Sequence, residues 1–192
     1  MSTRVRLIHE HFKIPHTVGH PAELTEEEQR QFLALSPSIK ETVQRHNLYY
    51  HSSDPRPNTP DRFVIGLHIE DAIYGTFYFG YGGPGEEGDR RAISEDIEQR
   101  IMTFAPETVL VLVKASAEVI AERLRREPRS NGVLKEKDIA YILGRFEEGY
   151  ANSSLRRKIE LDTSSSTAAR RWTSSSRRAS HTLRNKIVSA CL

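Results

Sequence analysis

Four histidines fall within twelve residues near the beginning of the sequence, and histidine is a common zinc ligand in proteins. His9 and His11 flank Glu10, so on a β-strand both imidazoles would face the same side. His16 and His20 follow a proline, and no regular geometry links them to the first pair. Two interpretations stay open, namely a zinc site or polar side chains of a loop beside a substrate cleft.

A glycine cluster at residues 80–85 spells Gly-x-Gly-x-x-Gly, the pattern of a loop that cradles phosphate. Such a loop needs free backbone N–H groups and a nearby cation, whereas Pro84 removes one N–H group and two glutamates follow. In the alternative frame, residues 83–88, Asp89 and Arg90 stand where a phosphate loop requires Lys and Ser or Thr. We therefore predict a flexible loop on the substrate side and no phosphate loop here.

Aromatic side chains lead into this cluster at Phe77, Tyr78, Phe79 and Tyr81. Their flat faces could stack on an aromatic base, and Tyr78 and Tyr81 are candidates for binding a substrate. We expect the four to end a strand, where packing in the core is the alternative role.

The elements that must hold these residues alternate between strands and helices. Residues 109–113 are five consecutive apolar residues that lead into an amphipathic helix, which is typical of a buried parallel strand and its crossover helix. We expect strands from residue 4 and at 62–69, 109–113 and 158–162, with helices at 24–35, 37–50, 89–104, 117–127 and 139–150. The alternation predicts an α/β fold, a three-layer parallel sheet with helices on both faces. A two-layer α+β fold is the alternative if the helices cover one face only.

Ligands of parallel sheets bind at the carboxyl ends of the strands, which places the candidate site at four turns. These turns follow Ile8, Leu67, Val113 and Leu161.

Composition is that of an ordinary globular domain, with 192 residues, 37% hydrophobic and 28% charged. The single cysteine, Cys191, excludes an intrachain disulfide, and no apolar run is long enough to span a bilayer, so we expect a cytoplasmic protein. Residues 164–192 hold six Lys or Arg and no Asp or Glu, which gives this segment +6 and the remainder −4. We predict one α/β domain at 1–163 and a basic, Ser- and Arg-rich disordered tail at 164–192.

From Phe63 to Thr167 the chain resembles the second half of P-loop nucleoside and nucleotide kinases, the thymidylate kinase and deoxynucleoside kinase group. The resemblance lies in the order and spacing of "VIGLHIEDAIY", "VLVLVKASAEVIAERLRR", "ILGRFEEGYANS" and "KIELDTSSST". It implies a P-loop NTPase-like α/β fold, phosphoryl transfer from ATP with Mg²⁺, and a small nucleoside or nucleotide as the second substrate. A homodimer is compatible with this resemblance, and neither a membrane nor a specific nucleic acid is expected as a partner.

Site residues carried over from the family fall in three places. Arg123 and Arg126 match the lid arginines that neutralise the transferring phosphoryl group, since an Arg fork bonds two oxygens at once. The turn of Asp162, Thr163 and Ser164 matches the place of the ATP adenine.

The third place is the turn near residue 70, where such kinases keep an acid and an arginine. Asp71 is the candidate for the catalytic base, with His68 and Glu70 as substrate-binding candidates. The family's own Asp-Arg or Glu-Arg pair is absent, and Leu67 and His68 stand nearest its place.

The largest departure from the family is at the front, because the first strand and its phosphate loop are not found before "RVRLIHEHF". The resemblance therefore implies an N-terminally incomplete domain, without its central strand and inactive as it stands. The alternatives are a noncatalytic nucleotide- or partner-binding module and a histidine-based metal-binding domain.

Overall fold

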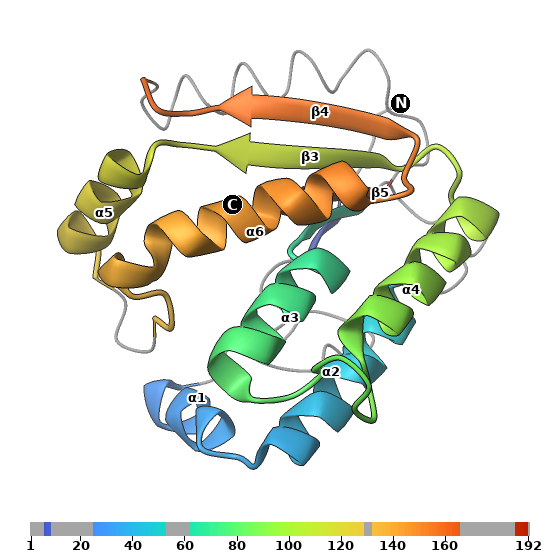
Figure 1. Ribbon diagram of the computed structural model, residues 1–192, viewed down its shortest axis with the longest axis horizontal. Helices are drawn as coiled ribbons and strands as arrows, with labels where there is room; N and C mark the ends of the chain where they lie inside the picture. Colours follow the sequence, from blue (N-terminus) through green and yellow to red (C-terminus); the bar gives the residue numbers. More distant parts are fainter. Residues whose placement is uncertain (1–5, 9–24, 53–61, 129–131, 166–186, 192) are drawn as a thin grey trace.

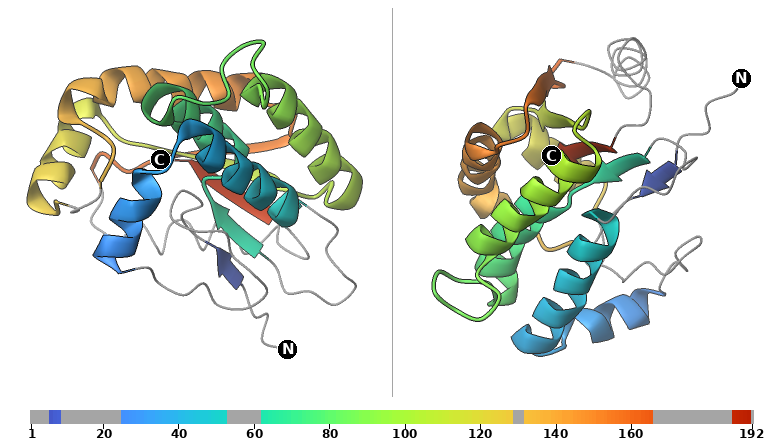
Figure 2. Two further views of the ribbon diagram at one scale, coloured as in Figure 1. Left: turned by 90° about the horizontal axis from the view of Figure 1, so that it is seen from below. Right: turned by 90° about the vertical axis from the view of Figure 1, so that its right-hand side faces the viewer.

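The fold is built on one sheet of five parallel strands. Figure 1 labels the helices that accompany the sheet, and the two views in Figure 2 show more of its strands. The structure is a computed structural model that describes residues 6–8, 25–52, 62–128, 132–165 and 187–191. The strands lie in the order β1-β2-β5-β3-β4. They are β1 (Arg6–Ile8), β2 (Arg62–Ile65), β3 (Val109–Lys114), β4 (Arg157–Asp162) and β5 (Ile187–Cys191).

In the described residues six α-helices accompany the sheet, and five of them begin within two residues of the positions that the sequence predicts. They are α1 (Glu26–Leu33), α2 (Pro37–Ser52), α3 (His68–Tyr74), α4 (Arg90–Phe104), α5 (Ala117–Arg126) and α6 (Ile139–Asn152). A π-helix, η1 (Gly75–Phe79), continues α3, and a 3₁₀ turn, η2 (Glu136–Asp138), precedes α6.

Side-chain caps explain where three of these helices begin. Thr25 and Glu28 form a reciprocal capping box at the start of α1. Asp89 accepts a hydrogen bond from the Arg91 N–H at the start of α4, and Ser116 caps α5.

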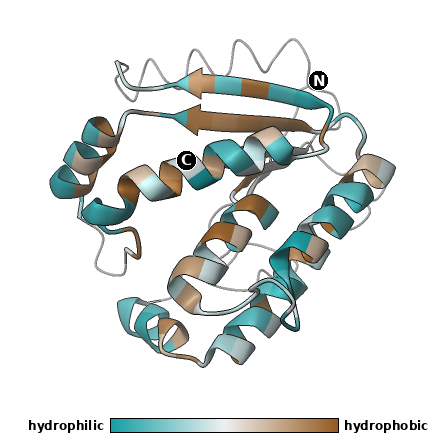
Figure 3. Ribbon diagram, in the orientation of Figure 1, coloured by the Kyte–Doolittle hydropathy of each residue, from teal (hydrophilic) through white to brown (hydrophobic). Residues whose placement is uncertain are grey.

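Strand β3 lies inside the sheet, with Val111 opposite Ile159 of β4 on one side and Ala190 of β5 on the other. Figure 3 shows that it is hydrophobic along most of its length. Leu110 and Leu112 join the main core, whereas Val109 and Val111 belong to a separate apolar cluster, because successive side chains of a strand face opposite sides.

The main core lies between the sheet and a layer of helices formed by α2, α3, α4 and α6, as the edge-on view in Figure 2 shows. Its centre includes Val64, Ile97, Leu110 and Phe146. The α/β class that the sequence predicts is confirmed, whereas helices on both faces of the sheet stay a prediction.

One predicted strand is wrong in its extent. The strand expected at residues 62–69 ends at Ile65, because Gly66 and Leu67 both have positive φ angles, 84° and 90°, and α3 begins at His68. The aromatic residues after it therefore lie on a helix, in η1 and the turn that follows, and do not end a strand.

The predicted tail is also wrong at its far end, since residues 187–191 form the central strand β5 between β2 and β3. This central strand is not the one that the sequence analysis expects to be missing, which is the family's first strand, before the phosphate loop. Residues 166–186 and 192 of the predicted tail lie outside the described residues. None of the described helices has the length and apolar character needed to cross a membrane.

Candidate functional site

The carboxyl ends of β3 and β4 are tied together by Thr163, the residue directly after β4. Its backbone N–H and its hydroxyl both donate to the Lys114 carbonyl, at 2.7 and 2.9 Å. Arg123 of α5 reaches the same residue, with Nη2 donating to the Thr163 carbonyl at 2.7 Å and Nη1 donating to its hydroxyl at 3.2 Å. A predicted catalytic arginine and a predicted nucleotide-binding turn therefore meet at this edge.

The rest of that turn is held by short polar contacts. The Ser164 hydroxyl accepts from the Ser116 N–H at 3.1 Å, and the Ser164 N–H donates to the Asp162 carboxylate at 2.8 Å. Hydrogen bonds from the Ser164 side chain and from its backbone N–H lower the pKa of Asp162. Arg126 lies elsewhere, exposed at the end of α5 with its Nε 3.6 Å from a Glu127 carboxylate oxygen.

The turn after β2 has an unusual backbone. Leu67 is buried and has a φ angle of 90°, which residues other than glycine rarely adopt. Backbone strain of this kind is often found at functional sites. At Gly66 a Cβ would stand 1.9 Å from Glu70 Oε2, so the Glu70 carboxylate folds back over this glycine. The substrate-binding candidate Glu70 is thus placed at the carboxyl end of β2.

Asp71 lies inside an ion network that is almost fully enclosed. Arg90 Nε is 2.5 Å from Asp71 Oδ2, and Arg90 Nη1 donates to Glu41 Oε1 at 2.7 Å. The Tyr81 hydroxyl donates to Asp71 Oδ1 at 2.7 Å, and the guanidinium carbon lies 4.7 Å from the centre of the Tyr81 ring. Arg90 and Asp71 are each only 1% exposed. Arg45 holds the other oxygen of Glu41 at 3.1 Å.

Burial raises the pKa of Asp71, although Arg90 and the Tyr81 hydroxyl oppose the rise by stabilising the carboxylate. Burial likewise raises the pKa of Tyr81, helped by the charge of Asp71. The network therefore satisfies its own charges, and Asp71 and Tyr81, predicted as catalytic and substrate-binding residues, meet each other within it.

The glycine cluster makes room for this network. A Cβ on Gly82 would lie 2.5 Å from Arg90 Cγ, and one on Gly88 would lie 2.4 Å from Glu41 Oε1. The N–H groups of Gly83 and Gly85 donate to the carboxylates of Glu86 and Asp89, at 3.0 and 2.8 Å. These two donors therefore bond to the protein's own acids.

His68, another substrate-binding candidate, is buried against Glu98 of α4, with Nε2 2.9 Å from Oε1. The second Glu98 oxygen accepts from the N–H and the hydroxyl of Ser154, both at 2.6 Å. Burial raises the pKa of Glu98, but the bonds and charge of His68 and the bonds from Ser153 and Ser154 outweigh it and lower the pKa to about 2. Among the residues that the structure describes, none forms a hydrogen bond with His68 Nδ1.

Glu98 should make the stability of the protein depend on acid. Because its folded pKa is below the ordinary 4.5, its contribution is complete above pH 4.5 and is lost as the pH falls toward 2. In the wild type, titration of Glu98 should lower the free energy of unfolding by about 3 kcal/mol as the pH falls from about 5 to 2. We expect this part of the pH dependence to be absent in Glu98→Gln. Urea denaturation across that range measures it. Glu95→Gln, an exposed change on the same helix, should leave the pH dependence as in the wild type, and equal curves for both variants would contradict the assignment.

Tyr78, the last substrate-binding candidate, is half-buried between η1 and η2. Its hydroxyl donates to Asp138 at 2.9 Å, and its ring stacks on Tyr74 with 5.6 Å between centres. This places Tyr78 against the loop before α6.

Sequence reasoning missed the partners that complete these groups. Glu41 and Arg90 lie 49 residues apart and His68 and Glu98 lie 30 apart, so no local pattern links them. One sequence feature that could have pointed to the network is Arg90, a charged residue directly after the helix cap Asp89.

Within the described ranges, no group of three or more His, Cys, Asp or Glu side chains could hold a metal ion. His9, His11, His16 and His20 lie outside these ranges, so the predicted zinc site is not described.

The described part of the chain thus defines an α/β domain with a parallel sheet and polar groups at its carboxyl edge. Comparison with protein-family models, with curated proteins and with solved structures found no match.

Proposed function

We propose that this chain is a nucleotide-binding α/β domain of the nucleoside or nucleotide kinase type, which binds ATP at the carboxyl ends of β3 and β4. The observation that carries the proposal is the junction of Arg123 with Thr163, because it joins a cation to the turn after β4 at the sheet edge where ligands bind. The guanidinium, whose Nη1 and Nη2 donate to Thr163, brings a positive charge to this edge, where it would attract the ATP phosphates. Mg²⁺ would enter with the ATP phosphates, as it usually does in phosphoryl transfer.

The proposal includes a three-layer, P-loop NTPase-like arrangement, with helices on the second face of the sheet as well. Supporting this, the face opposite the main core carries apolar side chains that need a cover. They are Val109 and Val111, both buried, with Val113, Ile159 and Leu161 packed against them.

The acceptor in this proposal is a small nucleoside or nucleotide, which binds near the turn after β2. Glu70 and the strained Leu67 support that placement, since strain of this kind is retained where function requires it. A noncatalytic module would share the ATP site and lack transfer to an acceptor.

Titration of the protein with ATP tests the proposal. We expect saturable binding with a Kd below about 1 mM, weakened roughly tenfold or more by Arg123→Ala, because a charge-assisted bond is worth about 1.5–3 kcal/mol. Arg126→Ala is the matched control, since Arg126 is exposed at the end of the same helix, and it should change the Kd by less than about twofold. Urea denaturation of both variants checks that they stay folded.

Absence of saturable ATP binding, or an equal effect of the two substitutions, would contradict the proposal. Measuring ADP release with a panel of nucleosides and nucleoside monophosphates then separates a kinase from a noncatalytic binding module.

A further inference from the structure

The face of the sheet opposite the main core is apolar along strands β3 and β4. We call this cluster the second face, and its side chains are Val109, Val111, Val113, Ile159 and Leu161. Val109 and Val111 are only 5% and 7% exposed. On a sheet face open to water such side chains keep much more of their surface, so another element must pack on the second face.

Strand β4 turns its charged side chains toward the helices on the main-core side. Lys158 donates to the Tyr150 carbonyl of α6 at 2.7 Å, and Glu160 pairs with Lys114 at 3.0 Å. Because successive side chains of a strand face opposite sides, the apolar residues of β4 point to the second face.

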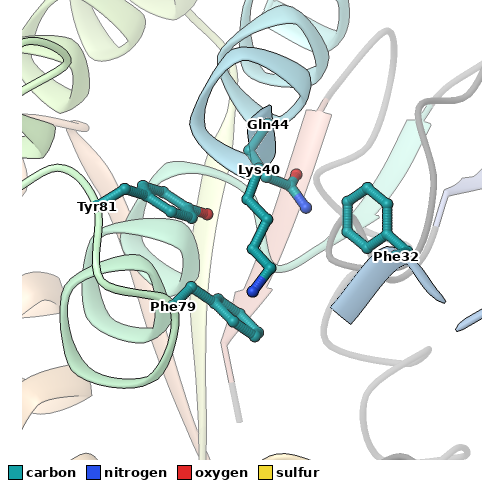
Figure 4. A pocket seen from close by; sticks show the side chains of 5 residues that line it. All are labelled: Phe32, Lys40, Gln44, Phe79 and Tyr81. Carbon is teal, nitrogen blue, oxygen red and sulfur yellow. The ribbon is translucent and has the colours of Figure 1, made fainter. Parts of the chain in front are cut away.

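The helices on the main-core side are closely packed with one another. Where α1, α2 and the turn after η1 meet, the space between the side chains does not admit a water molecule. Figure 4 shows the side chains around this space, which are Phe32, Lys40, Gln44, Phe79 and Tyr81. The element that packs on the second face must therefore come from elsewhere in the chain.

The order of the strands indicates which segment reaches the second face. From β2 to β3 and from β3 to β4 the chain moves across the sheet in one direction. The helices of these two crossovers lie on the main-core side, where α3, α4 and α6 pack into the core and α5 contacts α6. From β4 to β5 the chain moves back in the opposite direction, past β3. Crossovers between parallel strands are right-handed in about 98% of cases, so a crossover in the reverse direction runs over the opposite face of the sheet.

The sequence between β4 and β5, residues 166–186, suits this path. It is longer than the dozen or so residues that a crossover between parallel strands needs. Its two large apolar residues, Trp172 and Leu183, form a series with two alanines at intervals of four, seven and four, namely Ala168, Trp172, Ala179 and Leu183. Arginines recur seven residues apart at Arg170, Arg177 and Arg184. At 3.6 residues per turn these two series fall on opposite sides of a helix, one apolar and one basic.

We infer that residues 166–186 return across the second face, with Trp172 and Leu183 toward the apolar side chains of β3 and β4 and the arginines toward solvent. This segment, which the sequence analysis predicts to be a disordered tail, is then the third layer that the proposed three-layer arrangement requires. The inference involves no ATP, so it can fail while the proposed ATP site stands, and the ATP site can fail while the inference stands.

The fluorescence of Trp172 tests the inference directly, because it is the only tryptophan of the chain. In the native full-length protein we expect emission at a shorter wavelength than in concentrated urea, and quenching by acrylamide several-fold weaker, since the indole is shielded from water. Ile159→Asn, which places a polar group on the second face, should move the emission to longer wavelength and strengthen the quenching. Glu160→Gln is the matched control on the other side of β4 and should change neither. Circular dichroism during urea denaturation checks that both variants fold.

Stability gives a second readout. Trp172→Ser should lower the urea midpoint, whereas Arg171→Ser, at the preceding residue, should leave it unchanged. If Trp172 contacts the second face, Trp172→Ser combined with Ile159→Asn should lower stability by less than the sum of the two single changes.

Three results would overturn the inference. The first is native emission and quenching equal to those in urea, and the second is an equal urea midpoint for Trp172→Ser and Arg171→Ser. The third is an emission shift that develops only as the protein concentration rises, which would show that a second copy of the chain covers the second face.

Discussion

Replacing Arg90 by methionine should lower the free energy of unfolding by about 3–5 kcal/mol. The substitution leaves Asp71 and Glu41 as buried carboxylates without the cation that both contact, and Gly88 loses the bond that Arg90 donates to its carbonyl at 3.1 Å. Urea denaturation measures the loss, which is a large part of the stability of a domain of this size.

Arg91→Met is the matched control, because Arg91 is the next residue, is exposed and pairs with the helix cap Asp89. We expect a change within about 0.5 kcal/mol. Combining Arg90→Met with Asp71→Asn should recover part of the loss, because the Asp71 carboxylate, which would otherwise be buried without its cation, is then replaced by a neutral amide. Equal losses for the two arginine variants would show that the network does not carry stability as described.

A proline at Ser189 should have a comparable effect, about 3 kcal/mol or more, because Ser189 is in the middle of the central strand. Its register partners are Val64 in β2 and Leu110 in β3, so a lost N–H and the bulk of the proline ring disturb both ladders. Ser189→Ala is the control that keeps the N–H group. Urea denaturation compares the two variants.

Hydrogen exchange checks the same feature without any substitution. If residues 187–191 form the central strand, their hydrogen-bonded amides should exchange as slowly as those of β3, through global unfolding. Exchange at the rate of an unstructured peptide would contradict the placement of β5.

Local sequence patterns correctly predicted the helices and strands that are specified by their own apolar runs and helix breaks. The apolar run at 109–113 became β3, and the helices on either side of Ser36 and Pro37 formed as α1 and α2. By contrast, the aromatic run after residue 76 has strand propensity but follows Gly66 and Leu67, whose positive φ angles turn the chain into α3. Residues 187–191 were hidden because a strand is decided by pairing with distant neighbours, and the basic segment before it reads as a tail.

The candidate site was predictable only where it follows the sheet topology. Arg123 and Thr163 meet because parallel strands end at one edge, and that rule is legible in the sequence. The buried face of α2 could not be predicted from the sequence. This helix buries polar side chains at Lys40, Gln44 and Asn47, whereas an apolar stripe is the usual signal of a buried face. What those side chains face is set by tertiary contacts alone.

The position of β5 also fixes an order of events during synthesis on the ribosome. Until residues 187–191 have left the exit tunnel, the other described strands can form only two separate parallel pairs, β1 with β2 and β3 with β4, and each pair has one unpaired edge where β5 belongs. Strand β5, the last of the described strands along the chain, pairs with both β2 and β3, so the barrier to folding includes closure of the longest loops in the sheet. Before β5 is added, the unpaired edges of β2 and β3 are open to chaperones and to other nascent copies.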